Sequence, residues 1–166
     1  MAADVTAIAA VAENGAIGFE GAMPWDDYPA DLEHFKQHTE GHPVILGRVT
    51  YESIVDRLGG PLPGRTNVVV SESKHFSGEW LRTVQSPGSA ISLSLRIADE
   101  CYIAGGESIY KALLPVSNRL LITRVPESPQ ADSFFPELGD AWDQVDSEDG
   151  PNGLVFEEFR KQSKFD

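Results

Sequence analysis

The chain has 166 residues, of which 41% are hydrophobic, and its 13 Lys and Arg face 26 Asp and Glu, for a formal net charge of −13. The length and the hydrophobic fraction predict a single domain over residues 1–166 that buries about 70% of its unfolded surface, and they exclude a disordered acidic chain. Five scattered lysines disfavour nucleic acid as a partner, no apolar run approaches the ~20 residues that span a bilayer, and the first residues do not resemble a secretion signal, so a cytoplasmic protein is expected.

Strand and helix patterns alternate along the chain. Residues 5–12 are a continuous run of small, mostly apolar side chains, typical of a strand buried on both faces, and residues 14–28 form a Gly-rich loop. A helix is predicted to begin at Pro29 and to end at Gly41, because proline is tolerated in the first turn of a helix and glycine commonly ends one. The elements expected after it are strands at residues 43–46, 66–70, 83–84, 101–104 and 120–125, and helices at residues 50–58, 90–98 and 107–114.

This alternation predicts an α/β fold. Strand, helix, strand in repetition implies right-handed crossovers, and hence a mostly parallel central sheet with helices on both faces. The last segments differ, because two strand-like stretches at residues 142–146 and 154–159 flank the turn-rich residues 148–153. They predict a C-terminal antiparallel hairpin at the edge of the sheet.

The excess of acidic residues has two explanations. A carboxylate-rich, lysine-poor surface stays hydrated in a high-salt cytoplasm, whereas a concentrated acidic face would suit a basic partner. The acids are scattered along the whole chain and do not gather in one tail. The sequence therefore favours a halophilic protein, with the basic partner as the alternative.

Cysteine and histidine side chains have structural explanations. Cys101 lies within an apolar run, so a buried, inert thiol is expected in place of a nucleophile. His34, His38 and His42 recur every four residues, but the predicted helix ends before the third and no carboxylate motif completes a ligand set. We expect a solvated helix face there and no metal site.

Asp31 is the first candidate for chemistry. Its neighbours one and four residues along the helix are Leu32 and Phe35, so its carboxylate shares the apolar side of the helix. A carboxylate there is costly unless it meets a partner. It is either a first-turn acid stabilised by the helix dipole or a buried acid that binds a nitrogen-rich ligand through two hydrogen bonds.

Two strand-to-helix turns form the second candidate site. Residues 46–50 and 103–110 each place glycine at the carboxyl end of a predicted strand, where backbone N–H groups can hold a phosphate. Arg48 adds a fork of donors suited to phosphate oxygens. Two such turns fit a dinucleotide, although the chain lacks the Gly-x-Gly-x-x-Gly of standard dehydrogenases, the P-loop and the Gly-x-Ser-x-Gly elbow.

A tryptophan ends the Gly-rich loop and is the third candidate. Residues 22–25 read Ala-Met-Pro-Trp. A large aromatic side chain with an N–H donor in a loop suits a lid over a flat ligand.

These motifs belong to a longer series of recognisable segments. In chain order they are residues 8–11 (IAAV), 17–18 (IG), 22–25 (AMPW), 29–32 (PADL), 35–36 (FK), 43–48 (PVILGR), 50–54 (TYESI), 61–65 (PLPGR), 103–106 (IAGG), 109–110 (IY), 121–123 (LIT), 132 (D) and 134–136 (FFP). In this order they resemble dihydrofolate reductases over almost the whole chain.

The resemblance implies an NADPH-dependent oxidoreductase for one-carbon metabolism, which transfers a hydride from NADPH to 7,8-dihydrofolate and gives tetrahydrofolate. A monomer is expected. By resemblance, Asp31 binds the pterin amino group and N3, with Trp25 and Thr123 in support, while water delivers the proton to N5. The further substrate-binding residues that it implies are Ile8, Leu32, Phe35, Ile54 and Leu62, with Arg65 holding the glutamate α-carboxylate.

The same resemblance implies where NADPH binds. The residues concerned are Ala10, Ile17, Gly18, Met23, Gly47, Arg48, Val49, Thr50, Ser71, Glu72, Gly105, Gly106, Glu107, Ser108, Ile109 and Tyr110. Among them, Arg48, Ser71 and the position after Ser71 face the 2′-phosphate.

Two departures from the family pattern stand out. Glu72 occupies a position where the family usually has a hydroxyl or a basic group, which predicts weaker NADPH binding unless the carboxylate points away. The loop over residues 25–29 is one residue longer than in compact bacterial relatives. The alternative functions are a riboflavin-pathway reductase of the same fold and a non-catalytic pterin- or nucleotide-binding protein.

Overall fold

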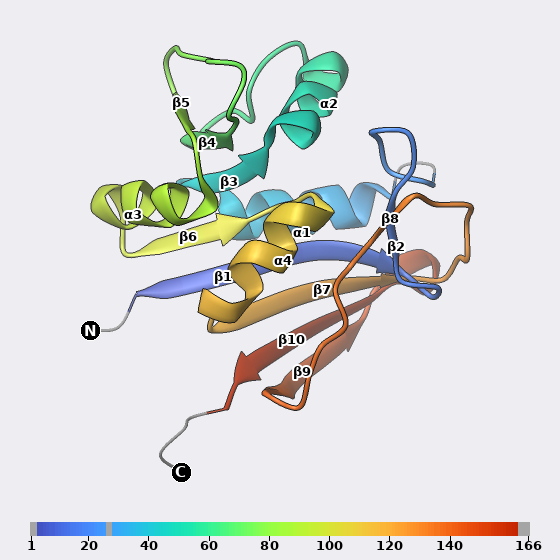
Figure 1. The fold of residues 1–166 in the computed structure, drawn as a ribbon. Helices are drawn as coiled ribbons and strands as arrows, with labels where there is room; N and C mark the ends of the chain where they lie inside the picture. The colour runs from blue at the N-terminus through green and yellow to red at the C-terminus, as the bar shows by residue number, and fades with distance from the viewer. Residues whose placement is uncertain (1–2, 26–27, 163–166) are drawn as a thin grey trace.

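An eight-stranded sheet forms the centre of the protein in a computed structural model that describes residues 3–25 and 28–162 (Figure 1). Its strands are β1 (Asp4–Ala12), β3 (Val44–Gly47), β4 (Asn67–Val70), β5 (Leu81–Val84), β6 (Glu100–Ile103), β7 (Arg119–Val125), β9 (Trp142–Asp149) and β10 (Val155–Lys161). They lie in the order β5-β4-β3-β6-β1-β7-β10-β9. All neighbours pair in parallel except β10, which runs antiparallel to both β7 and β9. The predicted parallel sheet and C-terminal antiparallel hairpin are confirmed.

Helices cover both faces of the sheet. They are α1 (Pro29–Thr39), α2 (Arg48–Leu58), α3 (Pro87–Ile97) and α4 (Glu107–Leu113), with 3-10 turns at Leu114–Val116 and Pro151–Gly153. Side chains of α1 and α2 pack into one hydrophobic cluster, whereas those of α3 and α4 pack into a second cluster on the opposite face. None of the helices in the described ranges is long and apolar enough to cross a bilayer.

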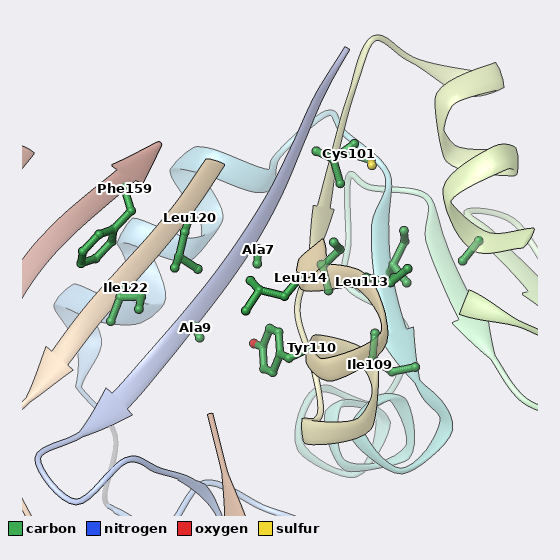
Figure 2. Close-up of a cluster of buried hydrophobic side chains, with 14 of the residues drawn as sticks. Ala7, Ala9, Cys101, Ile109, Tyr110, Leu113, Leu114, Leu120, Ile122 and Phe159 are labelled. Carbon is green, nitrogen blue, oxygen red and sulfur yellow. The ribbon is translucent and has the colours of Figure 1, made fainter. Parts of the chain in front are cut away.

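The central strand β1 shows why its sequence is apolar throughout. Ala7 and Ala9 belong to the cluster under α3 and α4, and Ile8 belongs to the cluster under α1 and α2. Figure 2 shows Tyr110 and Leu114 beside Ala7 and Ala9. The small side chains let the α4 residues approach the strand closely, so that the hydroxyl of Tyr110 donates to the carbonyl oxygen of Ile8 at 2.7 Å.

Two short strands were not predicted. β2 (Ala16–Gly18) pairs with β8 (Ser133–Phe134) in an antiparallel ladder at the start of the Gly-rich loop. Strands of two and three residues are too short to show a hydrophobic alternation in the sequence. They fix the base of the Gly-rich loop against the segment that follows β7.

Helix boundaries also differ from the prediction. α2 begins at Arg48, directly after β3, and not at residue 50. α3 begins at Pro87 and not at residue 90, because the Ser86 side chain caps it by accepting from the N–H of Ser89 at 3.1 Å. A serine followed by proline is a common start of a helix.

The solvated helix face predicted for the α1 histidines is wrong. His34 and His38 are half-buried, and the ring of His34 stacks on Phe156 of β10 with the centroids 4.4 Å apart. Burial, followed by the positive charges of His38 and Arg119, lowers the pKa of His34 to about 4. These rings are therefore neutral packing elements between α1 and the sheet. Cys101 is fully buried as predicted, and burial raises the pKa of its thiol to about 12.

Candidate functional site

Asp31 lies in the first turn of α1, against the carboxyl half of the central strands. Only 8% of its surface is exposed. Its carboxylate makes a side-chain hydrogen bond with Thr123 of β7, and Thr123 lies opposite Ala10 of β1 in the sheet register. Burial raises the pKa of Asp31, and the bond from Thr123 partly offsets that rise. The prediction of a buried acid with a polar partner agrees with this geometry.

Apolar side chains line the same face of the sheet. The structure brings Ile8 of β1, Phe35 of α1, Ile54 of α2 and Leu62 into one cluster. Leu32 is half-buried on α1 next to Asp31 but lies outside this cluster. A flat aromatic ligand lying on these side chains would leave its polar edge facing the carboxylate.

Arg65 is a buried cation in the loop between α2 and β4, with 4% of its surface exposed. Its Nε donates to the carbonyl oxygen of Pro63 at 2.8 Å and its Nη1 donates to Oγ1 of Thr39 at 3.0 Å. Among the residues that the structure describes, it forms no ion pair. Burial lowers its pKa, and the nearby charge of Glu40 acts in the opposite direction. Within residues 3–25 and 28–162 no hydrogen bond engages the other N–H on Nη1 or the two on Nη2, so these can bind an anion.

Two glycine turns meet at the carboxyl ends of β3 and β6. The N–H of Gly47 donates to the carbonyl oxygen of Gly105 at 2.8 Å, and the peptide bond between Gly105 and Gly106 is cis. A Cβ at Gly47 would lie 3.1 Å from a side-chain carbon of Ile109, and one at Gly106 would lie 3.2 Å from the hydroxyl of Thr50. A side chain at either glycine would therefore crowd a neighbouring side chain where the two turns meet.

The helices that begin at these turns leave backbone donors available. No side chain caps the N-terminus of α2 or of α4. The N–H groups of Val49 and Thr50, in the first turn of α2, therefore have no intrahelical acceptor. In the second turn, Ile109 and Tyr110 are buried in the core. The donor set suits the oxygens of a phosphate group.

Arg48, Ser71 and Glu72 lie at the end of the site away from Asp31. Arg48 opens α2, and its Nη1 lies 2.6 Å from a carboxylate oxygen of Glu52. Ser71 is buried directly after β4, and its hydroxyl oxygen accepts from the N–H of Lys74 at 3.0 Å. Glu72 is exposed. The sequence prediction included neither Glu52 nor Lys74, although the four-residue spacing of Arg48 and Glu52 on a helix signals a pair.

The Gly-rich loop faces α2 across a cavity. Gly18 and Glu20 are held by Asp132, because Asp132 donates its N–H to the carbonyl oxygen of Gly18 at 3.0 Å and accepts the N–H of Glu20 at 2.9 Å. A cavity of about 430 Å³ lies between the loop at residues 20–22 and the exposed face of α2. This arrangement gives the loop a fixed base and an open side toward the helix.

The other predicted loop residues lie along the same segment. Ile17 is half-buried in β2, Met23 is 41% exposed, and Trp25 is half-buried. No hydrogen bond of the Trp25 indole is found in the described ranges. The predicted extra residue of the loop falls on Asp26 and Asp27, which lie outside the described residues.

Glu107 is the predicted phosphate-turn residue with contacts of its own. One of its carboxylate oxygens accepts the N–H of Phe134 at 2.6 Å, and the other lies 3.5 Å from Nζ of Lys111. Ser108 beside it is exposed. Glu107 therefore connects the start of α4 to β8, and through β8 to the base of the Gly-rich loop.

Comparison with known proteins identifies one family. The family model described as "Dihydrofolate reductase" matches residues 4–158. The chain is 39% identical over 161 residues to the dihydrofolate reductase HdrB of Haloferax volcanii, covering 93% of this chain and 82% of that protein. It is 43% identical over 134 residues to a dihydrofolate reductase of Neisseria gonorrhoeae, covering 81% of this chain and 80% of that protein.

A solved structure has the same fold. Dihydrofolate reductase from Enterococcus faecalis, complexed with NADP(H) and RAB-propyl, superposes with a TM-score of 0.85 at 29% identity. The match covers 96% of this chain and 97% of that protein. Both the sequence and the three-dimensional arrangement thus have counterparts in one group of enzymes.

Proposed function

The chain belongs to the dihydrofolate reductase family and catalyses NADPH-dependent reduction of dihydrofolate, and we propose the roles by which its residues perform that reaction. Asp31 carries the proposal, because it is a buried carboxylate on a largely apolar face with the hydroxyl of Thr123 as a hydrogen-bond partner. Its oxygens accept two hydrogen bonds, from the 2-amino group and N3 of the pterin. That pairing orients the ring over Ile8 and Phe35.

Asp31 acts by polarising the pterin. Its negative charge, held in a poorly solvated position, favours the form of the ring that takes a proton at N5. No acidic side chain is assigned to N5, and water delivers that proton. Thr123 supports the carboxylate through its hydroxyl, and Trp25 closes the pocket from the Gly-rich loop.

Arg65 binds the glutamate end of the substrate. Its Nε and one Nη1 hydrogen are already used by Pro63 and Thr39. The remaining hydrogens on Nη1 and Nη2 lie in the plane of the guanidinium and match the two oxygens of a carboxylate. The two existing bonds fix the plane before the substrate arrives, so little side-chain entropy is lost on binding. Leu32, Ile54 and Leu62 lie along the benzoyl group between the two ends.

The glycine turns and the helix starts fit NADPH. When bound, NADPH supplies the hydride for the reduction. The backbone donors of Val49 and Thr50, with the Gly105–Gly106 turn, hold the pyrophosphate, while Ala10 and Ile17 contact the nicotinamide amide. The remaining residues assigned to the cofactor are Gly18, Met23, Gly47, Arg48, Ser71, Glu72, Glu107, Ser108, Ile109 and Tyr110, of which Arg48 and Ser71 bind the 2′-phosphate.

A turnover assay with one variant tests these roles. Wild-type protein with NADPH and dihydrofolate should consume NADPH, followed as the loss of nicotinamide absorbance. Asp31→Asn should bind NADPH as wild type does but lose most turnover at neutral pH, because a neutral amide neither polarises the pterin nor accepts both hydrogen bonds. Unchanged turnover of Asp31→Asn across pH would refute the role of Asp31.

We also propose a cytoplasmic, monomeric and halophilic enzyme of one domain over residues 1–166, and the acidic composition supports the halophilic part of this proposal. The net charge of −13 repels the anionic substrate and cofactor in dilute buffer. At 1 M salt the screening length is about 3 Å, so this repulsion nearly vanishes. The turnover rate and the midpoint temperature of thermal unfolding, measured from 0.05 to 3 M KCl, should both rise with salt. A maximum of either below about 0.2 M would contradict the halophilic assignment.

A further inference from the structure

Two cations share one carboxylate beside the end of the site that holds Ser71. Nη1 of Arg48 lies 2.6 Å from one oxygen of Glu52, and Nζ of Lys74 lies 3.1 Å from the other. A cavity of about 270 Å³ opens next to them, and Ser71, Glu72 and Lys74 line it. The cluster thus combines the residue assigned to the 2′-phosphate with a lysine that has no assigned role.

The turn after β4 places Lys74 in this cluster. The hydroxyl oxygen of Ser71 accepts the N–H of Lys74 at 3.0 Å, and the N–H of Ser71 donates to the carbonyl oxygen of Val84 at 2.9 Å. The chain therefore folds back after Ser71 instead of continuing away from the sheet. The fold-back directs Lys74 to α2, where Glu52 lies one turn after Arg48 on the same side of the helix.

The charges of the cluster favour a phosphate group. Hydrogen bonding and charge from Lys74, followed by those from Arg48, hold the pKa of Glu52 below its usual value, so Glu52 is ionised at neutral pH. Arg48, Lys74 and Glu52 together carry one positive unit of formal charge, and Glu72 brings the sum of the four to zero. Glu72 lines the same cavity and opposes an anion, and Lys74 offsets it. Without Lys74, the other three residues, Arg48, Glu52 and Glu72, would together carry a formal charge of one negative unit.

We infer that Lys74 is a specificity-determining residue for the 2′-phosphate of NADPH, supplying the basic group that the position of Glu72 lacks. This inference rests on the proposed assignment of Arg48 and Ser71 to that phosphate. Glu52 pairs with Arg48 through one oxygen and with Lys74 through the other, so one carboxylate keeps the two cations near each other. The 2′-phosphate then meets a guanidinium, an ammonium and the hydroxyl of Ser71.

Binding of NADPH and NADH to four forms of the protein tests the inference. Dissociation constants are measured by quenching of tryptophan fluorescence for wild type, Lys74→Gln, Lys74→Arg and the control Lys161→Gln. Lys161→Gln removes the same charge from β10, where the ammonium of Lys161 donates to the carbonyl oxygen of Pro115 at 2.6 Å. Lys74→Gln should weaken NADPH binding about twofold to fivefold and leave NADH binding unchanged, because an exposed charge contact contributes up to about fivefold in affinity.

The other two variants show whether the effect depends on the positive charge at position 74. Lys74→Arg should keep the wild-type ratio of NADPH to NADH affinity, and Lys161→Gln should also keep it. Equal weakening of both nucleotides by Lys74→Gln, or no change in either, would overturn the inference. Turnover of wild type with NADPH and dihydrofolate tests the proposed function separately, so an inactive wild type and an unchanged affinity ratio are distinguishable failures.

Discussion

Arg65→Lys gives the sharpest test of how the substrate is held. Lysine keeps a positive charge at the buried position but loses the planar fork. In the structure two donors of Arg65 are engaged by Pro63 and Thr39, at 2.8 and 3.0 Å, and a parallel pair on Nη1 and Nη2 is left for a carboxylate. A charge-assisted hydrogen bond contributes about 1.5–3 kcal/mol, and lysine can replace one of the two.

The expected loss is therefore about 1.5–3 kcal/mol of substrate binding, which corresponds to roughly a tenfold to hundredfold rise in KM for dihydrofolate. kcat should change little, because this carboxylate lies far from the reacting ring and binds equally in the ground and transition states. Steady-state kinetics with 7,8-dihydropteroate, which lacks the glutamate, supplies the comparison. Its KM should be the same for wild type and Arg65→Lys.

A control variant separates loss of the paired guanidinium donors of Arg65 from loss of the hydrogen bond that orients them. Thr39→Val removes the hydroxyl that accepts from Nη1 of Arg65 but leaves the guanidinium in place. Its KM for dihydrofolate should rise by less than about threefold, since one neutral hydrogen bond contributes about 0.5–1.5 kcal/mol and only part of it affects orientation. If Arg65→Lys raised KM equally for dihydrofolate and dihydropteroate, Arg65 would have only a structural role.

Three further substitutions have expected outcomes. Because burial raises the pKa of Asp31, its ionised form disfavours folding at neutral pH, so Asp31→Asn should unfold at higher urea than wild type at pH 7.5 and equally near pH 3.5. Burial lowers the pKa of His34 from its ordinary value of 6.5 to about 4, so the folded state binds fewer protons than the unfolded state as pH falls from 6.5 to 4. His34→Gln should therefore recover about 1–2 kcal/mol of unfolding free energy at pH 4.5 after solvent screening, and none at pH 7.5. Glu107→Ala should raise amide hydrogen exchange at Phe134 about tenfold, since it removes a charge-assisted bond, and unchanged exchange would show that β8 is held by its pairing with β2 alone.

The local sequence predicts elements where one signal dominates. The strand β1 was predicted from its apolar run and the start of α1 from Pro29, without information from the rest of the fold. The burial of Asp31 followed from its place among apolar neighbours on a helix. In contrast, the start of α3 depended on a cap at Ser86, and the pairing of β2 with β8 joins segments more than a hundred residues apart.

The contacts within the site were less predictable for the same physical reason. Lys74 reaches Glu52 only because the turn at Ser71 folds back, and no periodicity reports the path of a turn. His34 was expected in solvent because its partner, Phe156, lies in the last strand of the chain. Long-range packing decides which polar face of a helix is covered, and a single sequence does not contain that pairing explicitly.

The exposed outer strand β9 has a consequence for self-association. It lies at one edge of the sheet, and after Trp142 all of its residues are exposed, including Asp143, Asp146, Glu148 and Asp149. An unpaired strand edge is a template for another chain. In dilute buffer, repulsion between carboxylates keeps two such edges apart, but molar salt screens it. What persists at any salt concentration is the cost of stripping water from each carboxylate, so the acids of β9 still oppose the growth of the sheet from one molecule into the next.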